Sequence, residues 1–286
     1  MSKNRKFEVS NRIEKKYNTL LNKLLKPIKQ QAIKYVDDID KFRQVLENAA
    51  KSPAYRYSVR KLVRTISTMI YEENARNWRE AAKKSSRGAE IKSNIEKEIE
   101  GNVKKRMQEL FEYNATLIET LPLNISENVI AHINTEAFKG KRAEDISEEI
   151  KKYFPQHTKA NAKLIARTET SKFSSALTQA RAEDLNIEWY DWDTSKDRAV
   201  RSSHQIMENV LVHYKHPPVP EKLDTTLKLK KYPAPYHAGN IYNCRCYQAP
   251  LTDFDDVEWP HKVYNWKVDK IEMMGLNKFK EFNNYG

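Results

Sequence analysis

Apolar residues recur at spacings of three and four through the first 120 residues, which is the period of an amphipathic helix. The first run consists of Ile13, Tyr17, Leu20, Leu24 and Ile28. Two further runs occupy residues 59–70 and 91–111. Pro27 lies inside the first run and is expected to kink or break that helix near Lys26. The pattern predicts long helices that pack together through these apolar faces.

The pattern changes after residue 120. Shorter helices are predicted over residues 126–138 and 143–153, and a longer one over about residues 158–185. Pro155 separates the last two and is expected to mark a boundary. Strand-like stretches rich in β-branched and aromatic residues follow at 187–192, 209–214 and 241–250.

These elements predict a mainly α protein with a C-terminal α+β domain that contains a few antiparallel strands. The predicted parts are a basic N-terminal helical region at 1–154, the small mixed domain at 155–250 and a C-terminal extension at 251–286. The extension contains Trp259 and Trp266, which we expect to dock on the rest of the protein.

Positive charge is concentrated at the N-terminus. The chain has a formal net charge of +12, and its first thirty residues contain nine Lys or Arg against Glu8 and Glu14. Such a segment suits the phosphates of nucleic acid or an acidic protein surface, although a solvated helix face would look the same. The candidate contact residues are Lys3, Arg5, Lys6, Arg12, Lys15 and Lys16.

Apolar runs are too short for a membrane protein. No stretch approaches the ~20 apolar residues that span a bilayer. The N-terminus also lacks the apolar segment of a secretory signal. We therefore expect no membrane partner and a protein made in a cytoplasm, where cysteines are more often thiols or metal ligands than disulfides.

The two cysteines of the chain, Cys244 and Cys246, stand two positions apart. On a strand both would point to the same side. A zinc ion takes four sulfur or nitrogen ligands, and His204 and His237 are the candidates to join the pair. The other readings are a reduced thiol pair in a polar network without metal, and a strained disulfide. Apart from zinc, no cofactor is predicted.

Polar residues around this pair form the rest of the candidate site, and we expect their role to be structural. A helix predicted to begin near Lys196 would carry Asp197, Arg201 and His204 on one face. Seven helical residues separate Asp197 from His204 by ~10.5 Å, so Asp197 is expected to pair with an arginine rather than share an ion. The remaining members of the set are Arg167, Glu169, Asn243 and Arg245.

Four short motifs occur in order along the second half of the chain. They are ARTE at 166–169, the tryptophans Trp189 and Trp192, the DRAVRSSH stretch at 197–204 and NCRC at 243–246. Together they resemble the phage minor head proteins typified by protein F of phage Mu, often labelled "phage head morphogenesis". The resemblance covers about residues 155–250. The family pattern has a glycine where Asn209 stands, and Asn is the next best residue for positive φ. A role for His237 is not part of that pattern.

The resemblance implies a virion component present in few copies inside the head near the portal vertex, assembled in the host cytoplasm. The implied partners are the portal protein, the capsid and double-stranded DNA bound without sequence preference. It also implies that the protein accompanies DNA into the host. No nucleophile is paired with a recognisable base, so an enzyme is not predicted. The alternative function is a generic helical DNA-binding protein with a zinc-stapled module.

Overall fold

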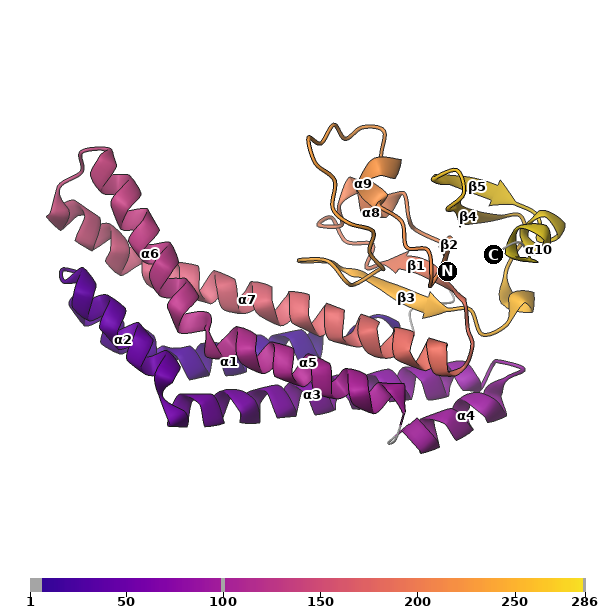
Figure 1. Cartoon of the computed structure of the whole chain (residues 1–286), viewed down its shortest axis with the longest axis horizontal. Coiled ribbons are helices and arrows are strands. Elements are labelled where there is room, and N and C mark those ends of the chain that lie inside the picture. Colours follow the sequence, from indigo (N-terminus) through magenta and orange to yellow (C-terminus); the bar gives the residue numbers. More distant parts are fainter. Residues whose placement is uncertain (1–6, 99–100, 285–286) are drawn as a thin grey trace. The chain divides into compact units, whose positions relative to one another are not determined.

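The computed structural model describes residues 7–98 and 101–284. The chain forms two compact units that alternate along the sequence. Unit 2 comprises residues 10–69 and 108–169, whereas unit 1 comprises residues 70–107, 170–284 and the described residues before Ser10. Three of the four boundaries fall inside helices α3 (Pro53–Ala82), α5 (Asn102–Glu119) and α7 (Ala143–Asp184), which Figure 1 labels, and the fourth lies just before α1. The fold therefore divides the chain differently from the three consecutive parts that the sequence suggested.

Unit 2 is entirely helical among its described residues. It contains α1 (Asn11–Ala32), the short 3-10 helix η2 (Ile33–Tyr35), α2 (Ile39–Lys51), α6 (Leu121–Phe138) and the adjoining parts of α3, α5 and α7. Ser10 and Asp38 cap α1 and α2, because their side chains accept the backbone N–H groups of Arg12 and Lys41. Phe42 and Phe154 meet edge to face with ring centroids 5.3 Å apart, in the middle of the core.

The prediction of a boundary at Pro155 is wrong, because α7 continues through it and the predicted separate helices 143–153 and 158–185 are one element. Of the kink or break expected at Pro27, the break does not occur, because α1 continues to Ala32. Each proline removes one backbone hydrogen bond. Around Pro155 the fully buried side chains of Ile150 and Phe154 hold the helix against its neighbours. Helical stability in proteins comes mostly from such packing, which outweighs the local loss.

The buried face of α1 is also displaced from the prediction. Ile13 and Tyr17 are buried as expected, but the core then takes Leu21 and Leu25 in place of Leu20 and Leu24. Leu20 and Leu21 are adjacent, as are Leu24 and Leu25, so two neighbouring faces of the helix are apolar. The packing of other helices against α1 therefore decides which of these faces is buried. The run at 91–111 is likewise divided between α4 (Gly88–Lys97) and α5.

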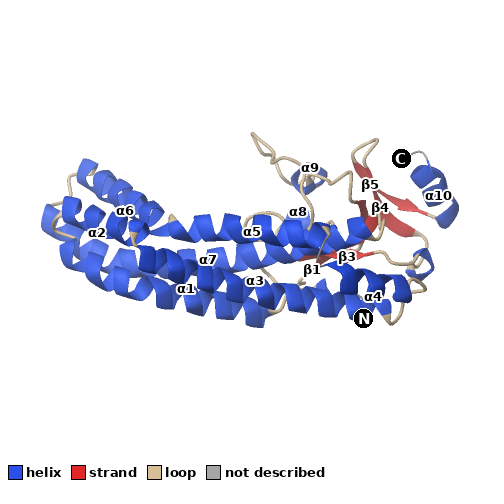
Figure 2. Cartoon of the chain, turned by 60° about the horizontal axis from the view of Figure 1, so that its bottom comes forward, coloured by secondary structure: helices blue, strands red, loops and turns tan. Residues whose placement is uncertain are grey.

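The five strands among the described residues all belong to unit 1 (Figure 2). They are β1 (Trp189–Thr194), β2 (Val210–His213), β3 (Cys246–Pro250), β4 (His261–Asn265) and β5 (Lys270–Met274). Their order is β3-β1-β2-β4-β5, and every neighbouring pair is antiparallel except β2 with β4. The fold class is confirmed: a mainly helical protein followed by a small mixed sheet.

Residues 251–286 are more than an extension that docks aromatics, because they supply β4 and β5. They also contain the 3-10 helix η4 (Phe254–Asp256) and helix α10 (Leu276–Asn284). Trp266 stacks on His216 with ring centroids 4.3 Å apart, and Trp259 contacts Phe279 of α10 at 4.9 Å. Trp259 also packs against the cluster that contains Trp189 and Leu211, so both tryptophans dock on earlier parts of unit 1 as expected.

The sheet is covered on both faces. Trp192 and Tyr190 of β1 lie in a core with Trp78 of α3. Trp189 faces the opposite way, toward Phe279 of α10. This alternation is the two-residue period of a strand buried on both sides. None of the described helices combines the length and apolar character that a bilayer span requires.

Candidate metal centre

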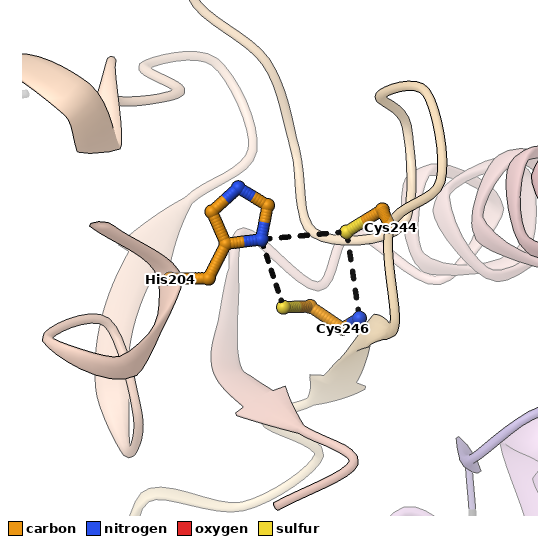
Figure 3. Close-up of side chains that lie close together, drawn as sticks. All are labelled: His204, Cys244 and Cys246. Atoms are coloured by element: carbon orange, nitrogen blue, oxygen red, sulfur yellow. Dashed lines mark hydrogen bonds between the residues drawn. The ribbon is translucent and has the colours of Figure 1, made fainter. Parts of the chain in front are cut away.

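Three potential metal ligands converge in unit 1, and they come from a short helix after β1 and from the turn and strand start at β3. His204 lies on the short helix α8 (Ser202–Gln205), Cys246 is the first residue of β3, and Cys244 precedes that strand in a turn. Figure 3 shows the three side chains pointing toward one another. The register Thr194↔Cys246 fixes the start of β3 beside the end of β1.

Two predicted elements differ in detail. The helix expected to begin near Lys196 begins at Ser202, and residues 197–200 form turns and bends, so Asp197 and His204 do not share a helix face. Cys244 lies outside the strand, because Asn243 has a positive φ of 54° that turns the chain immediately before it. The turn nevertheless brings both sulfurs to one side, as the spacing predicted.

The distances within the cluster are short. Nδ1 of His204 lies 3.6 Å from Sγ of Cys244 and 3.3 Å from Sγ of Cys246. The backbone N–H of Cys246 donates to Sγ of Cys244 at 3.4 Å. All three ligand atoms lie within 4.8 Å of one another, and each of the three residues is only 2% exposed. Both cysteines are free thiols rather than a disulfide.

A hydrogen-bonded chain orients the imidazole from its far side. Nε2 of His204 lies 2.8 Å from the Tyr236 hydroxyl, which in turn donates to Oε1 of Glu221 at 2.7 Å. A carboxylate can only accept, so the hydroxyl hydrogen is directed at Glu221 and the hydroxyl oxygen accepts Nε2–H. In the neutral ring Nδ1 therefore carries the lone pair, and this lone pair faces the two sulfurs.

The two thiols differ in acidity. The hydrogen bond from Cys246, together with the imidazole of His204, holds the pKa of Cys244 well below its ordinary value. Burial, followed by the neighbouring Cys244, raises the pKa of Cys246.

The surrounding polar residues join the two loops, as expected for a structural set. Asp197 pairs with Arg245 and accepts a hydrogen bond from the Ser195 hydroxyl at 3.0 Å. Arg201 donates to the backbone carbonyl of Tyr242 at 2.8 Å. Asp197 is therefore held by an arginine and stays outside the cluster.

His237 is not part of the cluster, although the sequence offered it as a fourth ligand. Its Nδ1 lies 3.2 Å from the Tyr190 hydroxyl, and its ring contacts Tyr214. Burial lowers the pKa of His237 to about 4, so the ring is neutral near pH 7. Proximity in sequence to the cysteines was misleading, because the loop before β3 directs this side chain into the aromatic core.

The ARTE residues, 166–169, lie in unit 2, whereas His204 and both cysteines belong to unit 1. Arg167 pairs with Glu14 of α1 at 3.2 Å, and Glu169 is buried. The ion pair of Arg167 ties α7 to α1. Asn209 has a positive φ of 56°. This is the conformation expected at a position where the family pattern has glycine, because glycine adopts positive φ without strain.

The predicted basic contact residues divide into two groups. Lys3, Arg5 and Lys6 lie outside the described residues. Arg12, Lys15 and Lys16 are exposed on α1.

Sequence reasoning missed Tyr236 and Glu221, the two residues that orient His204. Both lie in the proline-rich stretch between β2 and β3, Glu221 on the four-residue helix α9 (Pro220–Leu223). This stretch has no apolar periodicity that would place a side chain. The available signal was the chemistry of the two side chains. Carboxylates are common hydrogen-bond partners of ligating histidines, and a phenol can link such a carboxylate to the ring.

Comparison with known proteins identifies a family for part of the chain. Residues 127–249 match the family described as "Phage Mu protein F like protein". The chain is also 32% identical over 140 residues to an uncharacterized protein of Haemophilus influenzae. That match covers 49% of this chain and 28% of the relative, so the chain spans little more than a quarter of the relative's length. No solved structure matches significantly. The resemblance inferred from the four motifs is confirmed, and it begins earlier than residue 155.

Proposed function

Given a phage Mu protein F like domain over residues 127–249, we propose that this chain is a minor component of a phage head that acts in head morphogenesis at the portal vertex. The family match carries the proposal. It runs from within α6 to Ala249 of β3 and includes His204 and both cysteines. We place the protein inside the virion near the portal, and in the host cytoplasm while heads assemble.

A structural role suits the chemistry of the His204, Cys244 and Cys246 cluster better than catalysis does. His204, Cys244 and Cys246 are buried, and their partners tie one loop to another. A catalytic thiol needs access to a substrate, whereas a buried thiol acts within the fold. We therefore propose that this site closes the domain and that the exposed helical surface makes the contacts with other head components.

The exposed face of α1 supports the proposed contact with DNA. Arg12, Lys15 and Lys16 are exposed. The only acidic residue of that helix, Glu14, forms an ion pair with Arg167. A charge cluster of this kind attracts phosphates without reading base sequence. In a packaged head such contacts would hold the protein on the DNA end nearest the portal.

A groove beside this face supports a protein partner as well. It lies between α1 and α3 within unit 2, with a volume of about 540 Å³. Its lining combines the apolar side chains of Leu20, Leu24 and Leu62 with the amines of Lys16, Lys23 and Lys61. The combination suits an acidic amphipathic segment, because DNA would leave the leucines uncovered. We propose that the portal or a capsid protein supplies it.

Mass spectrometry of purified particles tests the proposed function. Particles of the phage that encodes this chain are analysed before and after triggered DNA release, with a photo-crosslinking residue at Thr65 beside the groove and, as a control, at exposed Lys280. We expect the protein in full heads at low copy number, with crosslinks from Thr65 to a portal or capsid protein. Its absence from the particles and recovery on free DNA would support the generic DNA-binding alternative instead.

A further inference from the structure

We propose that His204, Cys244 and Cys246 bind a zinc ion that staples the α8 loop to the start of β3. The proposal rests on the geometry of these three side chains and is independent of the role in the phage head. Zinc is the metal of choice for a buried set of sulfur and imidazole nitrogen ligands.

The distances from Nδ1 of His204 to the two sulfurs fit zinc coordination. With Zn–S near 2.3 Å and Zn–N near 2.0 Å, the donor atoms of a tetrahedral site lie roughly 3.5–3.8 Å apart. Nδ1 of His204 lies 3.3 and 3.6 Å from the two sulfurs. Small adjustments of the side chains would therefore admit the ion.

Hydrogen bonding cannot join both sulfurs to the imidazole at once. Nδ1 has a single lone pair, and both sulfurs lie against it. One S–H group can donate to that lone pair, so the second sulfur gains nothing from the imidazole. A cation placed between the three atoms would satisfy all of them at once, and it would accept both cysteines as thiolates.

The atoms behind the three ligands are already arranged as metal sites require. The Glu221–Tyr236 chain fixes the proton of His204 on Nε2 and turns Nδ1 toward the sulfurs. The backbone N–H of Cys246 points at Sγ of Cys244 and would stabilise a thiolate there. These groups would not bind the ion themselves, but their hydrogen bonds orient His204 and stabilise the thiolate of Cys244.

The described residues supply three ligands, and no fourth His, Cys, Asp or Glu side chain among them joins the group. His237 is turned away toward Tyr190, and Asp197 is held by Arg245. A tetrahedral ion would take its fourth ligand from outside this set of side chains. With His204 and Cys244 forty residues apart, one ion closes a long loop that has little regular structure of its own.

Metal analysis of the full chain tests the proposal. The protein is expressed and purified without added zinc, and its metal content is measured by mass spectrometry. The wild type, Cys246→Ser and His204→Gln are compared with His237→Gln, a control that removes a buried histidine outside the cluster. We expect about one zinc ion per chain in the wild type and in His237→Gln, and none in the two ligand variants.

Cobalt binding keeps the test decisive if a ligand variant fails to fold. Wild-type protein stripped by a chelator is titrated with Co²⁺, and we expect a near-ultraviolet thiolate-to-cobalt band together with tetrahedral visible bands. Tyr236→Phe retains all three ligands but lacks the group that orients His204, so its zinc affinity should fall about 10- to 100-fold. A folded wild type without zinc, without a cobalt band and with two titratable thiols would overturn the proposal.

Discussion

Arg181 forms a buried ion pair whose loss should weaken unit 1 far more than the loss of an exposed pair. Its side chain is fully buried, and its Nε and Nη2 donate to the two carboxylate oxygens of Glu98, each at 2.7 Å. Nη1 also donates to Asn74. Arg181→Met keeps an unbranched side chain but removes the charge, which leaves the Glu98 carboxylate buried and unpaired.

The expected cost follows from these contacts. Removing one partner of a buried ion pair costs about 3–5 kcal/mol, because the remaining charge keeps its desolvation penalty. Replacing both Arg181 and Glu98 with Met removes that penalty and leaves mainly the unpaired Asn74 oxygen, at about 1–2 kcal/mol. The double variant should therefore be more stable than Arg181→Met by about 2 kcal/mol or more, a strong coupling between the two positions.

Urea unfolding followed by tryptophan fluorescence measures this in unit 1, because all five tryptophans lie there. The control is Lys83→Met, which breaks an exposed pair with Glu80 at 2.6 Å and should cost less than about 1 kcal/mol. If Arg181→Met cost no more than this control, or if the double variant cost the sum of the single ones, the buried pair would not have the proposed effect.

Two other predictions concern charge. Burial, followed by the nearby Asp191 and Glu208 carboxylates, raises the pKa of Asp193 to about 8, so the native state holds a proton that the unfolded state releases above about pH 4. The group's contribution to stability is therefore lost as pH rises from about 4 toward 8. Relative to the wild type, Asp193→Asn should gain about 1.4 kcal/mol per pH unit between about pH 5 and 7 in urea unfolding, and a constant difference would contradict this. Replacing Arg12, Lys15 and Lys16 by Gln should weaken DNA binding and flatten its salt dependence by ~0.9 per lost phosphate contact, measured by fluorescence anisotropy at two salt concentrations; an unchanged slope would remove this face from the DNA contact.

Features that depend on a residue's immediate neighbours could be predicted from the sequence. The apolar runs predicted the helices, and the aromatic and β-branched stretches predicted β1 and β2. The Cys-x-Cys spacing predicted two sulfurs on one side, and Asn209 at a glycine position predicted a positive φ. Each of these is a property of a few consecutive residues, because backbone dihedral angles and side-chain direction are set locally.

Only the tertiary structure decided which distant residues meet. The sequence offered both His204 and His237 to the cysteines, and the path of the loop before β3 selected His204. Helix α7 passes through Pro155 because packing of Phe154 outweighs one lost hydrogen bond. Tyr236 joins the site across 32 residues. Such contacts depend on how segments far apart in the chain pack together. A local pattern of apolar and polar residues does not show which distant segments meet.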